Sequence, residues 1–591
     1  MTAIATRPLV FNNTVGWLND AEGSRGVVIA GGHGFEDLCS RRFLSLLAGA
    51  ISRAGLPVLQ FDYPGCGDAI GNHQTTNQLG SWLQAIDNAI DCLKAETGVS
   101  DVILIGFRLG ALLGYSAASR HKDVAALALL APPASGKSFM REQVALSRMI
   151  DSALEKSPMD DAFDGLSVAG FRLSQQTVEQ LKAFDPFGVT KDNKPPASIY
   201  LAARPGMAAN EGLVDHMEQL GSAVTRTSFD GYDSLMCDPT ANQIPLDVIQ
   251  RCTEWIIKQR GGTEDNPRGG TPQASNPPSV PRALIGPDYE EEPVLIGPAP
   301  HMVGIHCRPR QQDKAKPTQS EAYMLLNTGG NAHIGWARGY VETARTLAAH
   351  GIASLRIDLP DIGQSEASVD GRIPLYDEKA RKDVIRAIDW LCGRGYQNIA
   401  LTGICSGGHQ AFHAARLDKR VSKLVMVNPL CFAWNASYAL DLAIWKTYES
   451  SKVMMGQSMA TPKDNKPDGA LSRLRGKLSK RARVLVRRSI ELGKSGLAHL
   501  TPSALSQGNQ VKRWMQKLTA RGTKVMMICT DGDLSIEEID RHFGPDAMQL
   551  RAMQNVVIHT LHAADHSLTP LHARQSLATL LIEWDAAEPN H

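Results

Sequence analysis

The stretch Leu401-Thr-Gly-Ile-Cys-Ser-Gly-Gly408 decides the expected fold. It follows an apolar run and precedes a segment of helical character, and it places Gly403, Cys405 and Gly407 at alternating positions. This is the spacing of a nucleophile elbow, a sharp turn from strand to helix, with Cys where Ser is usual. The turn sets the thiol at a helix N-terminus, where the helix dipole favours the thiolate. The stretch therefore predicts a cysteine nucleophile.

The composition is that of an ordinary globular protein. The 591 residues are 43% hydrophobic and 21% charged, and the net charge is +1. This balance gives no reason to expect a nucleic acid or an anionic membrane as a partner. The ten cysteines include no C-x-x-C pair, and no apolar run reaches the roughly 20 residues of a membrane span. We therefore expect a cytoplasmic protein with reduced thiols, no transmembrane segment, no metal and no other cofactor.

One order of elements occurs twice along the chain. An apolar run, a glycine-rich turn and a helical pattern lead to a strand that ends at Asp62, and the same order leads to Asp358. Asp62 precedes Arg108, and Asp358 precedes Cys405, by nearly the same number of residues. Strand, turn, helix and strand in this order are typical of parallel βαβ units. The sequence predicts an α/β fold in which two tandem copies each form a mostly parallel sheet flanked by helices.

Composition divides the chain at a segment rich in Gly, Pro, Ser and Asn. We assign residues 1–260 to the first domain, 261–290 to a linker and 291–591 to the second domain. The second copy carries a longer insertion, at about 430–520, where a helical lid is expected. Within it, the leucines of 471–488 recur at helical spacing with Arg and Lys on the other faces, which predicts an amphipathic helix with a basic side. That side would also suit an anionic acyl carrier or a membrane surface.

The duplicated order of strand, glycine-rich turn, helix, Asp-x-Pro strand end, helix and elbow resembles the α/β-hydrolase superfamily. The resemblance covers about 20–255 and 295–585. The Gly-Ile-Cys-Ser-Gly elbow is similar to those of dienelactone hydrolases and polyhydroxyalkanoate synthases. In the superfamily the catalytic residues follow the order nucleophile, acid, histidine. The resemblance implies a Cys-His-Asp triad in the second copy, with Cys405 as the nucleophile.

Asp533 and His566 are the expected partners of Cys405. Asp533 follows the strand expected at 524–529, and His566 lies in the last loop, after the strand expected at 555–561. In such a triad the histidine takes the thiol proton and the acid orients the histidine. An aspartate at this place can also do no more than cap the following helix.

Neighbouring residues offer alternatives for each of these roles. Asp531 is a second candidate acid, His562 a second candidate base and Ser406 a second candidate nucleophile. His409 and His413 follow the elbow on its helix, and we expect them to pack rather than to act as bases.

The oxyanion that forms when the nucleophile attacks needs backbone donors. We expect one from the N–H of Ser406, the first residue after the nucleophile. The other is expected from the glycine-rich turn that spans Gly329, Gly330 and Asn331.

The first copy departs from the triad pattern at every position. Arg108 stands in the elbow Gly106-Phe-Arg-Leu-Gly110, Arg204 follows the strand where the acid is expected, and Tyr232 replaces the histidine. A guanidinium stays protonated and is no useful nucleophile. We expect a degenerate domain without hydrolytic chemistry. It is either purely structural, or a binding domain in which Arg108 clamps a carboxylate or phosphate.

Three functions are compatible with these patterns. The first is an enzyme that cleaves an ester, thioester or lactone through an acyl-cysteine intermediate. The second is an acyltransferase that moves an acyl group from a coenzyme A or carrier-protein thioester to a hydroxyl or amine, which the basic lid favours. The third is a non-catalytic binding or scaffold protein, against which the set of Cys405, Asp533 and His566 argues. A small acyl compound is the expected partner, and the sequence leaves homo-oligomerisation open.

Overall fold

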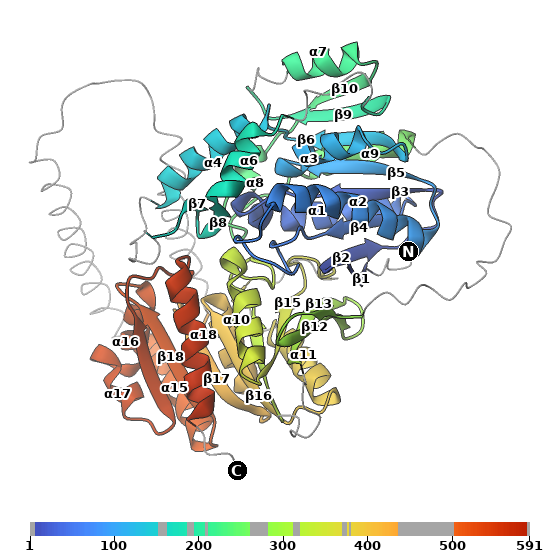
Figure 1. Cartoon of the computed structure of the whole chain (residues 1–591). Helices are drawn as coiled ribbons and strands as arrows, with labels where there is room; N and C mark the ends of the chain where they lie inside the picture. Colours follow the sequence, from blue (N-terminus) through green and yellow to red (C-terminus); the bar gives the residue numbers. More distant parts are fainter. Residues whose placement is uncertain are drawn as a thin grey trace, which may run out of the picture.

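A computed structural model shows two halves, each built on one large sheet (Figure 1). It describes residues 6–151, 162–185, 194–206, 211–259, 282–310, 320–368, 375–376, 380–434 and 502–587.

The first half contains an eight-stranded sheet with the strand order β1-β2-β4-β3-β5-β6-β9-β10. The pairs β1–β2 and β2–β4 are antiparallel, and all the other neighbours are parallel. A separate hairpin is formed by β7 and β8. The elements of this half are β1 (Thr6–Phe11), β2 (Thr14–Asn19), β3 (Arg25–Ala30), α1 (Phe35–Arg53), β4 (Val58–Phe61), α2 (Gln78–Thr97), β5 (Asp101–Phe107), α3 (Leu109–Ala118), β6 (Val124–Leu130), α4 (Gly136–Asp151), β7 (Gly165–Val168), β8 (Phe171–Ser174), α6 (Gln175–Ala183), β9 (Ser198–Ala203), α7 (Glu211–Gln219), β10 (Ala223–Ser228), α8 (Tyr232–Leu235) and α9 (Leu246–Lys258).

The second half contains a nine-stranded sheet with the order β11-β12-β13-β15-β14-β16-β17-β18-β19. Apart from the two-residue β11, each strand has a counterpart in the first sheet with the same neighbours and the same directions. The elements are β11 (Leu284–Ile285), β12 (Tyr289–Ile296), β13 (Met302–Pro309), β14 (Glu321–Leu326), η2 (Trp336–Arg338), α10 (Gly339–Ala349), β15 (Ala353–Asp358), α11 (Arg381–Gly393), β16 (Asn398–Ile404), α12 (Ser406–Ala415), β17 (Val421–Val427), α15 (Pro502–Ala520), β18 (Lys524–Thr530), α16 (Leu534–Phe543), η4 (Pro545–Ala547), α17 (Met548–Arg551), β19 (Val556–Leu561) and α18 (Leu571–Ala586).

Helices cover both faces of each sheet, and each face has its own apolar core. In the first half, α1 and α9 pack on one face and α2 and α3 on the other. In the second half, α10 and α18 take the first of these roles, and α11, α12 and α15 take the second. The central strands β5 and β16 are almost wholly buried, as expected for parallel strands covered on both sides. The predicted α/β fold with two mostly parallel sheets is confirmed.

The two halves share a small apolar core where the first strands of each sheet meet. Side chains of β1 and β2 pack there against side chains of β11 and β13 (Figure 1). The members of this core are Val10, Val15, Trp17, Leu284, Val303 and Ile305. Burial of these residues ties the two halves together through the hydrophobic effect.

A network of buried charges also lies between the halves. His333 is 2.7 Å from Asp68 through Nε2 and 2.8 Å from Asp358 through Nδ1. Arg356 binds Asp68 at 2.9 Å and Glu291 at 2.5 Å. These five side chains are at most 1% exposed. Asp68 comes from the first half and the other four from the second, so each cation depends on a partner in the opposite half.

Arg338 adds a second set of polar contacts across the same boundary. Its guanidinium donates four hydrogen bonds of 2.9 Å to backbone carbonyl oxygens of one loop of the first half, those of Gly65, Gly67, Ala69 and Gly71. The loop is thereby held against the start of α10.

We expect Asp68→Asn to lower the free energy of unfolding by roughly 3–5 kcal/mol, because it leaves His333 and Arg356 buried without their shared carboxylate. Urea denaturation of the full chain measures this change. The matched control is Asp20→Asn, since Asp20 forms a surface ion pair with Arg7 whose side chains are 51% and 37% exposed. That pair should contribute less than about 1 kcal/mol. Equal effects of the two substitutions would contradict the network's role.

The network also predicts a pH dependence. Burial alone would lower the pKa of His333, but Asp68 and Asp358 outweigh it and raise the pKa to about 10. In the unfolded chain the pKa of a histidine is about 6.5. The protonated ring therefore stabilises the fold fully below about pH 6.5, and this contribution is lost as the pH rises towards 10. Denaturation at several pH values should show this loss, and His333→Gln should remove it. An unchanged slope in the variant would refute the assignment.

Two predicted boundaries need correction. The second sheet begins at Leu284, so the end of the segment 261–290, assigned to a linker, belongs to that sheet; residues 260–281 lie outside the described part of the chain. The end of the predicted lid is also wrong, because α15 places Val511, Met515 and Leu518 in the core beside the second sheet. Residues 435–501, which include the basic amphipathic segment 471–488, lie outside the described residues.

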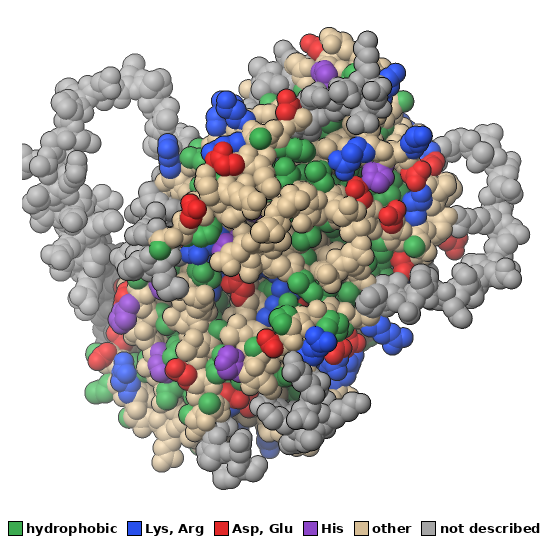
Figure 2. All heavy atoms as spheres, viewed as in Figure 1, with side chains coloured by type: hydrophobic (Ala, Val, Ile, Leu, Met, Phe, Trp, Pro, Cys, Tyr) green, Lys and Arg blue, Asp and Glu red, His purple; other side chains and the backbone are tan. Residues whose placement is uncertain are grey.

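The charged side chains of the visible face are interspersed, with Lys and Arg next to Asp and Glu rather than gathered by sign (Figure 2). Among the described helices, none combines the length and the hydropathy that crossing a membrane requires.

Candidate active site

The elbow has the strand–turn–helix geometry that its sequence predicts. β16 ends at Ile404, α12 begins at Ser406, and Cys405 between them has φ 56° and ψ −115°. An L-residue adopts this conformation only where the surroundings enforce it. A Cβ on Gly403 would lie 2.1 Å from the carbonyl carbon of Gly407, so the tight turn requires a glycine there. The backbone strain is thus concentrated at the residue predicted to be the nucleophile.

Asp533 and His566 lie together beside the elbow. The Nδ1 of His566 is 2.7 Å from Oδ2 of Asp533. Cys405 is near enough to the His566 ring to raise its pKa. Asp533 is also the N-cap of α16, where its Oδ1 accepts from the N–H of Ser535 at 2.8 Å. Asp533 therefore both caps α16 and holds His566. Asn428 fixes the loop by donating to the backbone oxygen of His566 at 2.9 Å.

The electrostatics of this set favour a charged histidine. Burial alone would lower the pKa of His566, but Cys405 and Asp533 outweigh it and raise the pKa well above its ordinary value. Burial alone would raise the pKa of Asp533, but hydrogen bonds from His566 and Ser535 bring it below its ordinary value. This arrangement suits a thiolate–imidazolium pair with an ionised aspartate behind it.

The alternative residues lie elsewhere. His562 and Asp531 bind each other at 2.9 Å on the surface, where their side chains are 80% and 50% exposed. His409 and His413 are buried and interact with the backbone oxygens of residues 431 and 432. Burial, with help from His409 and Arg416, lowers the pKa of His413 to about 2. These histidines pack below the elbow, as expected.

The predicted oxyanion donors need a correction. The N–H of Gly330 donates to Thr240 Oγ1 of the first half at 3.1 Å, and the N–H of Asn331 donates to the carbonyl oxygen of Thr328 at 3.1 Å. Both amides already have an acceptor. The N–H of Gly329 also has an acceptor, because it donates to the hydroxyl of Ser406 at 2.9 Å. As the first residue of α12, Ser406 presents its own N–H outside the helical hydrogen-bond pattern.

Tyr376 is a functional candidate that the sequence reasoning missed. Its hydroxyl lies 3.2 Å from the sulfur of Cys405, and both residues are buried. The ring stacks on Trp434 with an interplanar angle of 3° and meets His409 edge-on. Tyr376 stands between β15 and α11 in no regular element, so neither periodicity nor a motif could have placed it next to the thiol.

The first half keeps the elbow but fills the site with charged side chains. Arg108 has φ 53° and ψ −115°, nearly the same as Cys405. Its guanidinium is 1% exposed and binds Glu36 at 2.7 Å and Glu142 at 2.6 Å. Glu142 also binds Arg204 at 2.9 Å, and both guanidiniums lie over the ring of Tyr232. The suggestion that Arg108 clamps a ligand is therefore wrong, because two carboxylates of the chain already neutralise it.

The first half also covers part of the second half's site. Thr240 accepts from the N–H of Gly330, and a Cβ on Gly330 would lie 2.3 Å from the carbonyl oxygen of Pro239. The β7–β8 hairpin reaches the loop that follows His566, where a Cβ on Gly170 would meet the carbonyl oxygen of Thr569 at 2.4 Å. Within the described ranges, no cluster of His, Cys, Asp and Glu is arranged to hold a metal ion.

Comparison with known proteins bears on the fold. Residues 23–187, in the first half, match the family described as serine aminopeptidase, S33. Among curated proteins, none matches the chain.

Similar solved structures each span one half of the chain or slightly less. Est1E from Butyrivibrio proteoclasticus, with bound ferulic acid, has a TM-score of 0.33 and 18% identity, covering 43% of this chain and 98% of its own. An esterase from Pyrococcus furiosus has a TM-score of 0.32 and 13% identity, covering 44% and 91%. A putative esterase from Staphylococcus aureus has a TM-score of 0.30 and 15% identity, covering 45% and 86%. With its two matching strand orders and the family match of residues 23–187, this chain has the α/β-hydrolase fold.

Proposed function

We propose that the second half is a hydrolase that cleaves an ester, thioester or lactone through an acyl-cysteine intermediate. One observation carries the proposal: the strained elbow presents Cys405 to His566, which Asp533 holds at 2.7 Å. A buried cysteine without a function would need none of these arrangements. This geometry supports the proposal, whereas the fold by itself does not assign an activity.

In the proposed acylation, the Cys405 thiolate attacks the carbonyl carbon of the substrate. The carbon–sulfur bond forms as the carbonyl electron pair moves onto oxygen, and the N–H group of Ser406 at the start of α12 stabilises that oxyanion. The carbonyl then re-forms as the bond to the leaving group breaks, and His566 gives its proton to that group. Asp533 keeps the imidazole in the productive tautomer throughout.

In the proposed deacylation, His566 takes a proton from water while the water oxygen attacks the thioester carbonyl. The carbon–sulfur bond breaks, the acid product leaves, and the thiolate–imidazolium pair is restored. The same base serves both steps, as in other covalent acyl transfer.

One observation also favours acyl transfer to a hydroxyl or amine. The Cys405 side chain is only 3% exposed, and the first half lies against the loops at the site, so access of water to the intermediate is restricted. Turnover of p-nitrophenyl esters and acyl thioesters, with and without an added amine, separates the two. Free acid in both cases supports hydrolysis, product formed only with the amine supports transfer, and no turnover of any substrate opposes both.

We infer that the two halves arose by duplication and that the first half lost its chemistry while keeping a covering role. The matching strand orders and the near-identical backbone angles at Arg108 and Cys405 support this history.

We expect Tyr376→Phe to raise the pH at which iodoacetamide modifies Cys405 half-maximally by about 1–2 units. The hydroxyl stabilises the thiolate through a hydrogen bond to a charged acceptor, which is typically worth roughly 1.5–3 kcal/mol. Stacking on Trp434 remains in the variant. The matched control is Tyr396→Phe, which removes a buried hydroxyl bonded to His306 in another part of the second half. If both variants keep the wild-type pH profile, the hydroxyl has no part in activating the thiol.

A further inference from the structure

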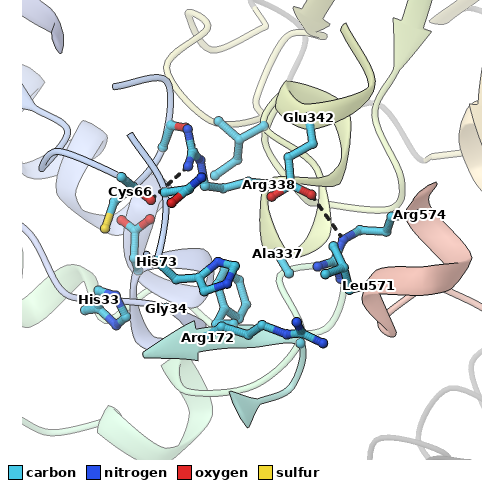
Figure 3. Close-up of a pocket in the computed structure, with 17 residues that line it drawn as sticks. His33, Gly34, Cys66, His73, Arg172, Ala337, Arg338, Glu342, Leu571 and Arg574 are labelled. Atoms are coloured by element: carbon cyan, nitrogen blue, oxygen red, sulfur yellow. Dashed lines mark hydrogen bonds and ion pairs between the residues drawn. The ribbon is translucent and has the colours of Figure 1, made fainter. Parts of the chain in front are cut away.

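A pocket lies between the two halves, outside the proposed catalytic residues (Figure 3). Its walls come from the start of α1, the loop after β4 and the β7–β8 hairpin in the first half, and from the starts of α10 and α18 in the second. Three arginines from three separate elements line it: Arg172 of β8, Arg338 at the start of α10, and Arg574 of α18. No part of the proposed acyl chemistry uses these side chains.

The positive charges of the three arginines also affect the pKa of a histidine that lines the pocket. His73 lies in the same wall, and after burial, the three guanidiniums lower its pKa further. Each of the three arginines is therefore close enough to His73 to disfavour a fourth positive charge there. Burial alone also lowers the pKa of His33 to about 4, so this second histidine is neutral near pH 7.

The arginines are held in place by contacts that leave the pocket between them. Arg172 lies over the ring of Phe163, with its guanidinium 4.6 Å from the ring centroid. Arg338 is fixed by its four carbonyl acceptors, which are neutral groups that leave its positive charge in place but occupy four of its five N–H donors. Arg574 is buried and donates to the carbonyl oxygen of Thr569.

Two acidic residues also face the pocket. Asp37 is bound by Arg41 at 2.8 Å, so its charge already has a partner. Glu342 is 3.8 Å from Arg574, which is a long ion pair, and its side chain is 40% exposed (Figure 3). Glu342 can therefore turn towards solvent when a stronger anion arrives. Cys66 lines the pocket as well, but burial raises the pKa of its thiol to about 12, which makes it unreactive near neutral pH.

We propose that this pocket binds a phosphate group. Positive charge from three directions, with the donors of Arg172 and Arg574, suits a tetrahedral anion with several acceptor oxygens, whereas a single carboxylate is served by one planar guanidinium fork. Arg574 also lines a second, smaller pocket next to Ile404 and Ser567, the residues beside the proposed nucleophile and histidine. A phosphate attached to a larger ligand would place the rest of that ligand near this smaller pocket.

Isothermal titration of the full chain with inorganic phosphate tests the proposal. We expect saturable binding that weakens with added salt. Arg172→Ala should weaken it roughly ten- to a hundredfold, since a hydrogen bond to a charged group is lost. Glu342→Gln should tighten it several-fold, because a like charge leaves the site. The matched control is Arg226→Ala, which removes a half-exposed arginine of β10, far from these residues in the fold, and should change nothing.

The opposite signs of the two pocket variants protect the test against misfolding, because a damaged protein does not bind more tightly. Coenzyme A, 4′-phosphopantetheine and pantetheine identify the source of the group, because phosphopantetheine differs from pantetheine only by its phosphate, whereas coenzyme A also carries an adenosine portion. Tighter binding of coenzyme A than of phosphate, with no binding of pantetheine, indicates a phosphate carried by a larger ligand. Equal binding of coenzyme A and phosphate indicates a free anion.

Absence of phosphate and coenzyme A binding, or wild-type affinity in both Arg172→Ala and Glu342→Gln, would overturn the proposal. Cys405→Ala should bind phosphate as the wild type does. Phosphate binding in the pocket can therefore be supported or refuted independently of the acyl-cysteine chemistry.

Discussion

Cys405→Ala should lower kcat by about a millionfold, to a residual rate that binding and the oxyanion donors alone sustain. The substitution removes the atom that forms the covalent intermediate, so neither His566 nor Asp533 has a nucleophile to activate. Steady-state turnover of whichever ester or thioester the wild type accepts measures the loss.

The control for this variant is Cys392→Ala. Cys392 is a free and partly exposed thiol at the end of α11, more accessible than the buried Cys405. Its removal should leave turnover unchanged. A Cys405→Ala protein that retains wild-type activity, with its fold intact by circular dichroism, shows that this thiol is not the nucleophile.

Asp533→Ala should lower kcat by roughly ten-thousandfold. Asp533 holds the Nδ1 side of His566, so its loss frees the ring to adopt the wrong tautomer and removes the charge that stabilises the imidazolium. The same residue caps α16, so the variant should also be destabilised by about 1 kcal/mol. Asp533→Asn retains an acceptor for the cap and should show the loss of kcat with a smaller loss of stability.

Asp531→Ala is the control for the acid. Asp531 lies two residues earlier and binds His562 on the surface, so its removal should affect neither kcat nor stability appreciably. If Asp531→Ala lowers kcat and Asp533→Ala does not, the assignment of the acid is reversed.

The parts of the site that the sequence predicted are those coded by local pattern. The elbow can be recognised from five residues, because other backbone segments approach Gly403 and Gly407 too closely for any residue with a Cβ. Asp533 and His566 each follow a strand that the apolar pattern reveals, and the order of elements fixes which strand ends meet.

The missed parts depend on contacts between segments far apart in the chain. Tyr376 reaches Cys405 from an irregular segment, where no periodicity indicates the direction of a side chain. His333 and Asp68 are separated by 265 residues and meet only because the two halves pack together. The sequence does not reveal that Thr240 of the other half approaches Gly330, so it wrongly predicts the Gly330 amide as an oxyanion donor.

For Arg108, the sequence predicted the position of the residue but not its partners. Its place in the elbow was visible in the sequence, but its partners Glu36 and Glu142 lie on two different helices. A buried guanidinium with two carboxylates is part of a closed ionic cluster, whereas the sequence alone left a ligand clamp open.

The central claim is that an acyl group becomes attached to Cys405. Intact-mass measurement of the full chain, mixed with an acyl thioester and quenched in acid within one turnover, tests it most directly. We predict one adduct of the acyl mass per chain, located at Cys405 by peptide mapping and absent from Cys405→Ala. Turnover without any adduct in the wild type, or an adduct located at another residue, would contradict the claim.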